Sequence, residues 1–420
     1  MMPDNRTDIA VIGAGAAGCF CAIEIRRAHP ELSVSLFEAG RAPMAKLALT
    51  GGGRCNLTNT FAGVRNLSEV YPRGERLMKR ALKEFGPEET MRWFEREGVR
   101  LVVQDDECVF PQSQDAMQIV RVLENLILRT GVKLACNKKV TSISPLPQDG
   151  SPESGFSLSF SDGGRVKANK VVFAIGGCSS SVLESILPQG IELVRTVPSL
   201  YTFKIADESL RALMGTVVPR VGLSLPGTSF RAGGILLLTD WGVSGPATLR
   251  LSSYAARHLA EGGYNAVLLV NWLDSKEEAV RESLLSLSAA NPNKLVSSTR
   301  PDGLPDRLWR HILRRSALRE DLRWAELGQK GFNRLVGRLT TDEYRIAGRA
   351  RFKEEFVTCG GVALSGIDLS TQQSKLYPGL YFAGEVLDVD AVTGGFNLQA
   401  AWSMGWRVAQ RIICTENSYL

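Results

Sequence analysis

The sequence predicts an α/β protein whose parallel sheet is interrupted by an inserted segment of strands and helices. Three observations lead to this class. A glycine-rich turn follows an apolar strand at the start of the chain, a second strand–glycine–helix segment stands near its end, and residues 192–344 between them have a different character. With 420 residues, 44% of them hydrophobic, the chain is long enough for two or three domains.

The first observation is a strand, a turn and a helix at the N-terminus. The apolar run DIAVIG, residues 8–13, is typical of a buried parallel strand. It leads into GAGAAG, which places Gly13, Gly15 and Gly18 in the G-x-G-x-x-G pattern before the helical segment AAGCFCAIEIRRA. Such glycines permit a tight turn, the approach of backbone to a pyrophosphate, and close packing of helix on strand. The unit predicts a dinucleotide site at the helix N-terminus.

A carboxylate ends the second strand of this unit. SVSLFE runs from Ser33 to Glu38, and Glu38 stands 20 residues after Gly18. A carboxylate at this position accepts a hydrogen bond from a ribose 2′-OH and repels a 2′-phosphate, so NADP is a poor occupant. The alternative is a glycine-rich turn without a ligand. The joint occurrence of strand, helix, second strand and carboxylate argues against it.

The second strand–glycine–helix segment lies near the C-terminus. GLYFAGE is an apolar strand ending in Gly384 and Glu385, and TGGFNLQAAWSMGWRVAQRI turns through Gly394 and Gly395 into a helix. A helix that begins near Asn397 would place its positive end against the pyrimidine edge of a flavin and stabilise the reduced anion. A closing strand and a packed helix without a ligand are the alternative.

These segments resemble the bacterial FAD-dependent oxidoreductases of the YhiN type, also labelled aminoacetone-oxidase-family or BaiN-like flavoproteins and related to a bile-acid reductase group. The resemblance rests on VIGAGAAG, KLALTGGGRCNLTN, VVFAIGG, LLTDWGVSGPATLRLS, TCGGVALSGID and PGLYFAGEVLDVDAVTGGFNLQAAWSMG, and it covers nearly the whole chain. It implies a Rossmann-type FAD-binding domain of the two-dinucleotide-domain, glutathione-reductase kind. The segment AIGGCSSS, residues 174–181, lacks the proline and extra glycines of many members.

The middle of the chain predicts an insert. SLYTFKI, GGILLLTD and NAVLLVNWL are strand-like, whereas the sequence turns helical and charged from about Ser275. Such an insert, a β-barrel or sandwich with a helical subdomain, normally covers the flavin face and shapes the substrate pocket. Within TDWGVSGPA, Trp241 is interpreted either as a stacking wall for the flavin or as a core residue. The expected domains are FAD-binding in residues 1–191 and 357–420, β in residues 192–274 and 338–356, and helical in residues 275–337.

The run LTGGGRCNLTN, residues 49–59, contains three consecutive glycines, which weaken helices and strands alike. In flavoproteins of this architecture the corresponding loop passes over the pyrophosphate and the flavin ring. Glycines let main-chain N–H groups reach a phosphate or the flavin, and Lys46 and Arg54 neutralise phosphate charge. Asn56 and Asn59 would stabilise the turn or bind the cofactor. We therefore interpret the run as backbone brought up to FAD.

The expected cofactor contacts follow from these segments. They are Gly13, Gly15, Ala16, Ala17, Gly18, Glu38, Ala39, Lys46, Thr50, Gly51, Gly52, Gly53, Arg54, Cys55, Asn56, Val140, Ala174, Gly176, Gly384, Glu385, Gly395, Asn397 and Leu398. Cys55 is interpreted as structural or cofactor-contacting, with a thiolate activated by its arginine neighbour as the alternative. Because the chain has three histidines and none lies in a motif, a hydrolase triad or histidine metal site is not expected. No residue is identifiable as an acid or base.

Composition restricts the partners. A net charge of +6 permits a phosphorylated cofactor but is low for a nucleic-acid binder, and RLWRHILRRSALRE is interpreted as the solvated side of an amphipathic helix. Eight scattered cysteines without a CxxC indicate thiols in a reducing cytoplasm. No apolar stretch is long enough to span a membrane. We expect a cytoplasmic protein with a small-molecule substrate, no metal and no nucleic-acid partner.

The sequence is thus interpreted as an FAD-dependent oxidoreductase. Hydride would pass between a small organic substrate and flavin N5, and oxygen, a quinone or transiently bound NAD(P)H would reset the cofactor. Two alternatives stay open. A flavin-dependent RNA-modifying enzyme would need a clustered basic surface, and a flavin-binding sensor or partner protein would need no turnover.

Overall fold

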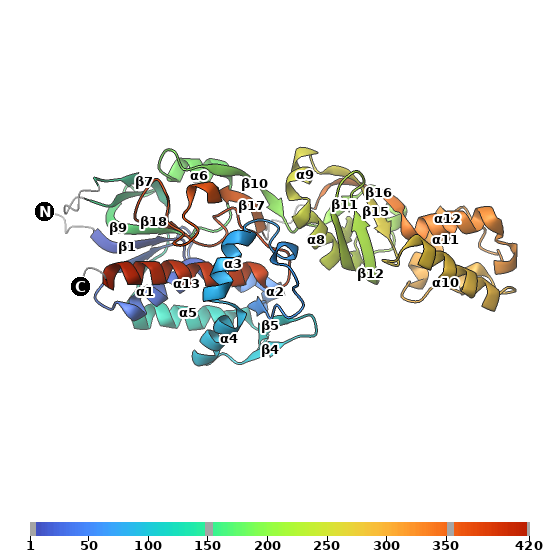
Figure 1. Cartoon of the computed structure of the whole chain (residues 1–420), viewed down its shortest axis with the longest axis horizontal. Helices are drawn as coiled ribbons and strands as arrows, with labels where there is room; N and C mark the ends of the chain where they lie inside the picture. The colour runs from blue at the N-terminus through green and yellow to red at the C-terminus, as the bar shows by residue number, and fades with distance from the viewer. Residues whose placement is uncertain (1–5, 148–153, 351–356, 418–420) are drawn as a thin grey trace. The chain divides into compact units, whose positions relative to one another are not determined.

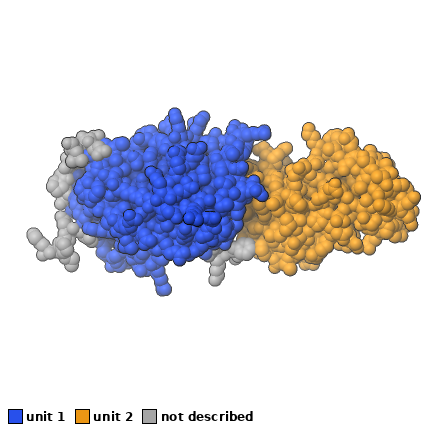
Figure 2. All heavy atoms as spheres, turned by 90° about the horizontal axis from the view of Figure 1, so that it is seen from below, with its two compact units in different colours: residues 1–197, 357–420 blue, residues 198–356 orange. Residues whose placement is uncertain are grey.

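The computed structural model describes residues 6–147, 154–350 and 357–417. Contacts divide the chain into two compact units, which are unit 1, Met1–Val197 with Val357–Leu420, and unit 2, Pro198–Phe356 (Figure 2). The first boundary expected from the sequence lies at residue 191 rather than 197. The difference arises because β10, Leu193–Ser199, pairs with β17, Val357–Val362, and does not join the strands of unit 2.

The helices and strands of unit 1 lie in two stretches of the chain, one up to residue 199 and one from residue 357 onward (Figure 1). They are β1 Arg6–Ile12, α1 Ala16–Ala28, β2 Val34–Phe37, η1 Leu47–Leu49, α2 Thr50–Gly53, β3 Thr58–Asn59, η2 Leu67–Glu69, α3 Glu75–Glu84, α4 Pro87–Arg96, β4 Leu101–Val103, β5 Cys108–Pro111, α5 Ala116–Thr130, β6 Lys133–Ala135, β7 Val140–Pro145, β8 Phe156–Phe160, β9 Arg165–Phe173, α6 Ser180–Ile186, β10, β17, η5 Leu364–Gly366, β18 Leu380–Phe382 and α13 Phe396–Asn417.

The main sheet of unit 1 is built on parallel strands in the order β6-β2-β1-β9. On the side away from β1, the nine-residue strand β9 pairs with two strands. Its first half pairs antiparallel with β8, and its last three residues pair parallel with β18. All residues of β2 and β18 are buried, as expected for parallel strands covered on both faces. Helix α1 packs against α13 and α5 (Figure 1). The Rossmann-type class is confirmed.

Unit 2 combines a barrel with helices, as the sequence predicts. Its elements are β11 Phe203–Ile205, α7 Glu208–Arg211, β12 Val217–Ser224, β13 Arg231–Leu238, β14 Gly242–Ser244, α8 Pro246–Tyr254, α9 Ala256–Glu261, β15 Asn265–Asn271, α10 Glu277–Ala290, η3 Val296–Ser298, α11 Asp306–Arg315, η4 Trp324–Glu326, α12 Gly328–Thr340 and β16 Asp342–Arg349. Six strands close the barrel in the order β11-β14-β13-β12-β15-β16.

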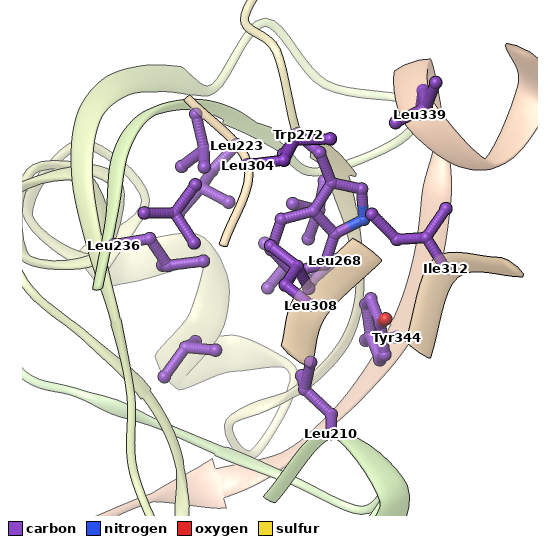
Figure 3. Packing of buried hydrophobic residues seen from close by; sticks show 14 of the residues in the cluster. Leu210, Leu223, Leu236, Leu268, Trp272, Leu304, Leu308, Ile312, Leu339 and Tyr344 are labelled. Atoms are coloured by element: carbon purple, nitrogen blue, oxygen red, sulfur yellow. The ribbon is translucent and has the colours of Figure 1, made fainter. Parts of the chain in front are cut away.

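One hydrophobic cluster joins the barrel of unit 2 to its helices. Figure 3 shows Leu308 and Ile312 of α11 together with Trp272 and Tyr344 of the barrel, and all four are at most 2% exposed. Helix α11 provides this face because its apolar residues recur at helical spacing while its arginines point outward. The interpretation of the basic run as an amphipathic helix is therefore correct. Within the part of the chain that is described, no helix is long and apolar enough to cross a membrane.

Candidate functional site

The predicted glycine turns follow strands that end level with one another. Ile12 of β1 is in register with Phe37 of β2 and with Phe173 of β9, and Phe173 is in register with Phe382 of β18. The next residues along the chain are the predicted Gly13, Glu38, Ala174 and the segment Ala383–Glu385. All of them therefore lie at the carboxyl edge of one sheet, where open α/β folds bind their ligands.

The three glycines of the first turn have different surroundings. A β-carbon on Gly13 would lie 2.5 Å from the carbonyl oxygen of Ala174, and one on Gly18 would overlap the carbonyl oxygen of Gly13. A β-carbon on Gly15 would meet no heavy atom within 4 Å. Packing thus requires glycine at positions 13 and 18. Gly15 instead leaves an open approach to the backbone N–H groups at the start of α1. That opening fits the pyrophosphate of a dinucleotide.

Glu38 is held in place by the same turn. Its Oε2 accepts a hydrogen bond from the Ala14 N–H at 2.9 Å, and its Oε1 accepts one from the Gly40 N–H at 2.7 Å. A carboxylate oxygen has two lone pairs, so each oxygen keeps capacity for a further donor. Glu38 is half-buried, which leaves the carboxylate accessible to a ribose hydroxyl. The expected ribose-binding position is therefore both fixed and reachable.

The triple-glycine run forms a left-handed turn. Gly51 has φ of 59° and Gly52 has φ of 69°, values that other residues rarely adopt. A β-carbon on Gly52 or Gly53 would meet nothing within 4 Å, so their backbone faces open space. Arg54 lies over the Phe110 ring at 4.4 Å and donates to the Gly51 carbonyl at 3.1 Å. The open space beside Gly52 and Gly53 leaves room for an anionic cofactor to approach the backbone of this loop.

The two glycine-bearing blocks from opposite ends of the chain are in direct contact. Asn59 Nδ2 donates to the Gly394 carbonyl at 3.1 Å, and Thr58 Oγ1 donates to Gln399 Oε1 at 2.5 Å. Gly395 packs so closely on the Thr58 carbonyl that a β-carbon would overlap it. These contacts show that the GGGRCNLTN block and the TGGFNLQ block meet in space.

Further hydrogen bonds fix the start of α13 against the same block. Trp402 Nε1 donates to the Leu57 carbonyl at 3.0 Å, and the Tyr71 hydroxyl donates to the Phe396 carbonyl at 2.9 Å. Asn56, in the amide orientation that satisfies both groups, accepts from the Gly395 N–H at 3.2 Å. Sequence analysis missed Tyr71 and Trp402. No local pattern marks them, because their partners lie hundreds of residues away in the chain.

Glu385 connects three segments at the carboxyl edge. Its Oε1 accepts from the Thr358 N–H at 2.7 Å, and its Oε2 lies 3.7 Å from Lys46 Nζ. Gly177 must be glycine, because a β-carbon there would lie 2.5 Å from Glu385 Oε1 and overlap Thr358. The neighbouring Gly176, with φ of 75°, would carry its β-carbon 3.8 Å from the same carboxylate. Lys46, which the sequence expected at a phosphate, thus forms an ion pair beside the site.

The side chain of Asn397 has a structural partner. Its Oδ1 accepts from the Ala391 N–H at 2.9 Å, and its Nδ2 donates to the Ala391 carbonyl at 3.0 Å. The amide therefore holds the loop before α13. What the helix offers a ligand here is the backbone N–H groups of its first turn, Phe396 to Leu398, which have no intrahelical acceptor. A ligand at this helix end would therefore meet the backbone rather than the asparagine side chain.

Cys55 is a buried thiol. It has no exposed surface, and burial raises the pKa of its thiol to about 12, although a hydrogen bond with Thr50 acts in the opposite direction. The neighbouring Arg54 does not counter this rise in pKa, because its guanidinium lies over Phe110 instead. The thiolate alternative is therefore disfavoured. The structural interpretation of Cys55 fits its burial.

The remaining expected contacts lie around this edge, apart from one in unit 2. Val140 begins β7 and is buried, two residues after Lys138, whose N–H donates to the Glu38 carbonyl at 2.8 Å. Ala17 touches Gly384, whose β-carbon would lie 3.0 Å from that of Ala17. Trp241 belongs to unit 2, so its role as a stacking wall stays a prediction.

Comparison with known proteins agrees with this architecture. Residues 7–411 match the family described as HI0933-like protein Rossmann domain. The ribosomal RNA dihydrouridine synthase of Escherichia coli is 30% identical over 99% of this chain and 100% of its own, and the 3-dehydro-bile acid delta(4,6)-reductase of Clostridium scindens is 26% identical over 95% and 97%. The solved 3-ketosteroid-delta4-(5alpha)-dehydrogenase of Rhodococcus jostii shares 14% identity, with a TM-score of 0.49 over 98% of this chain and 97% of its own.

The extent of the family match decides the assignment. It covers both halves of unit 1 and the whole of unit 2, and it includes the two glycine-bearing blocks that meet at the carboxyl edge. The resemblance to YhiN-type and BaiN-like flavoproteins is confirmed. The chain belongs to the HI0933-like Rossmann-domain family and is an FAD-dependent oxidoreductase.

Proposed function

We propose that this enzyme is a reductase that saturates a carbon–carbon double bond conjugated with a ring carbonyl, and that its substrate is a uridine of ribosomal RNA. Two relatives support the reaction type. One is named for making dihydrouridine, which differs from uridine by two hydrogens across a double bond conjugated with the C4 carbonyl. The other is named as a reductase of ring double bonds in a 3-oxo steroid. The two names share one chemistry on two substrates.

The observation that carries the choice of substrate is the full-length match to the ribosomal RNA enzyme. At 30% identity it covers 99% of this chain and all of the relative, against 26% and 95% for the bile-acid enzyme. An RNA substrate differs from the small molecule expected from composition. It corresponds to the RNA-modifying alternative. An enzyme of that kind would need a clustered basic surface to bind RNA.

The residues at the carboxyl edge fit FAD. Open backbone at Gly15, Gly52 and Gly53 would receive the pyrophosphate, and Glu38 would accept from the ribose. The first turn of α13 would face the flavin pyrimidine and stabilise negative charge there. When bound, FAD supplies a hydride from N5. NAD(P)H is proposed as the reductant that restores it.

The proposal is tested by following reduced enzyme with candidate acceptors. FAD-loaded protein is reduced without oxygen, once with NADH and once with NADPH, and then mixed in a stopped-flow instrument with ribosomal RNA transcribed in vitro or with a 3-oxo-4,6-diene steroid. We expect the RNA to reoxidise the flavin rapidly, and nucleoside mass spectrometry to find dihydrouridine. Rapid reoxidation by the steroid alone would reject the RNA substrate. Productive reoxidation by neither acceptor would favour the flavin-binding sensor.

A further inference from the structure

The charge of the chain is concentrated in one of its two units. Unit 1 contains 27 Lys and Arg and 27 Asp and Glu, so its net charge is zero. Unit 2 contains 23 Lys and Arg and 17 Asp and Glu, and it therefore carries the entire net charge of +6. Residues 275–341, the helical part of unit 2, account for 13 basic and 8 acidic side chains, a net charge of +5. A mild average thus conceals a basic subdomain.

Helix α12 presents a basic stripe of three residues, of which Arg338 pairs with Asp342 at 3.2 Å. Lys330, Arg334 and Arg338 recur every four residues, which places them on one helix face, and residues 328–341 contain no Asp or Glu. Lys330 and Arg334 are exposed, and neither makes an ion pair with any described residue. From Lys330 to Arg338 the helix rises by eight residue steps, or about 12 Å at 1.5 Å per step. That length covers several successive phosphates of a nucleic-acid strand.

A surface groove adjoins this stripe. It has a volume of about 290 Å³ and is lined by Arg315, Ser316, Ala317, Arg334, Gly337, Arg338 and Thr341. The carbonyl ends of α11 and α12 lie here, and each contributes a partial negative charge of about half a unit. Asp207 and Asp342 offset the charges of Arg315 and Arg338, so the positive charge left for an anion beside the groove is that of Arg334 and Lys330.

Arg315 is fixed in this groove before any ligand binds. It pairs with Asp342 at 2.9 Å and with Asp207 at 2.7 Å, and its guanidinium lies over the Tyr344 ring at 4.4 Å. Asp342 has no exposed surface and also accepts from Arg338 at 3.2 Å. Because Arg315 already donates from Nε and from both terminal nitrogens to Asp342, Asp207 and the Glu343 carbonyl, it shapes the wall of the groove and leaves phosphate contacts to its neighbours on α12.

We propose that the α12 stripe and the adjoining groove are the surface on which this enzyme docks the phosphate backbone of its RNA. This inference rests on the proposed function, because it assigns the RNA a place on the protein. Contacts of this kind position a nucleic acid without reading its sequence. The contribution to binding is electrostatic and therefore depends on salt.

The test compares two double variants of the FAD-loaded enzyme. K330Q/R334Q removes two unpaired charges from the stripe. R76Q/K79Q is the matched control, since it removes one arginine and one lysine at exposed positions of α3, in the neutral unit 1, where neither makes an ion pair with a described residue. Binding of small- and large-subunit ribosomal RNA transcribed in vitro is measured by filter retention over a range of salt concentrations. FAD content and thermal unfolding establish that both variants are folded.

Losing two phosphate contacts should reduce the slope of log affinity against log salt by about 1.4. The same relation predicts a loss of affinity of about 25-fold at 0.1 M salt that vanishes toward 1 M salt. The control should stay near wild type. Equal behaviour of the two variants, or wild-type binding without salt dependence, would overturn the docking surface, even if wild-type enzyme makes dihydrouridine. If the difference persists and no dihydrouridine forms, the surface stands and the proposed reaction fails.

Discussion

Replacing Gly15 by alanine separates cofactor binding from folding. Gly15 has φ of −85°, which alanine adopts freely, and a β-carbon there would meet no heavy atom within 4 Å. Gly15 is the N-cap of α1, where alanine is less favourable than glycine, but alanine also reduces the entropy of the unfolded chain by about 0.4–1 kcal/mol. These two effects oppose each other, so the apoprotein should change in stability by less than about 1 kcal/mol.

The same methyl group should weaken FAD binding strongly. If the pyrophosphate lies against this turn, the methyl group displaces it from at least one backbone N–H. A hydrogen bond to a charged group contributes about 1.5–3 kcal/mol. Its loss corresponds to roughly 10- to 150-fold weaker binding, at 1.4 kcal/mol for each factor of ten.

Gly18→Ala provides the contrast. Its β-carbon would overlap the carbonyl oxygen of Gly13, and overpacking of this kind costs about 1–3 kcal/mol. The assay is FAD titration of the apoproteins by quenching of flavin fluorescence, with urea unfolding of the same apoproteins, because bound FAD would itself raise stability. We expect G15A to lose affinity with normal stability, and G18A to lose stability. Wild-type FAD affinity in G15A would refute the placement of the pyrophosphate.

Three further outcomes are expected. Glu38→Ala should release FAD during desalting, and E38Q should release less because it keeps one acceptor; equal retention in all three proteins would remove the ribose role. Because the pKa of the Cys55 thiol is about 12, native protein should resist alkylation of Cys55 by iodoacetamide well above neutral pH, and peptide mapping that finds it modified there would contradict its burial. Burial lowers the pKa of His311 in the folded chain below its usual value of 6.5. At pH values below about 6.5 the unfolded chain therefore binds more protons than the folded chain. Stability should therefore fall as the pH drops below about 6.5, and His311→Gln should reduce this slope in urea unfolding measured across that range.

Local elements were predictable because local rules determine them. Helix α1 begins at Ala16 and ends at Ala28, as its sequence predicts, since the glycine turn fixes its start. Glu38 follows β2 directly, at the position where a ribose carboxylate is expected. The barrel strands β13 and β15 lie within or overlap the apolar runs that predicted them. Each of these features depends on residues close together in sequence.

Pairings across the chain were not predictable in detail. Thr58 bonds Gln399 across 341 residues, and Trp402 bonds Leu57 across 345. The hydrophobic periodicity and the turn residues indicate that such segments are buried. They do not identify the residues with which each segment forms contacts. The position of the Arg54 side chain was not predictable for a similar reason. Its guanidinium lies over the ring of Phe110, which belongs to a strand more than fifty residues later in the chain. Net charge has a different limit, because an average over the chain does not show that one unit is neutral and the other is basic.

The way unit 2 is inserted leaves the contacts at the carboxyl edge of unit 1 independent of it. The chain leaves unit 1 after β10 and returns in β17, and these strands pair with each other, so both ends of the insert are anchored in unit 1. The pairing is close, because a β-carbon on Gly360 would overlap the Arg195 carbonyl. The contacts that join the two glycine-bearing blocks, such as Asn59 with Gly394, lie wholly within unit 1. Changes in unit 2 can therefore leave the contacts between these two blocks unchanged.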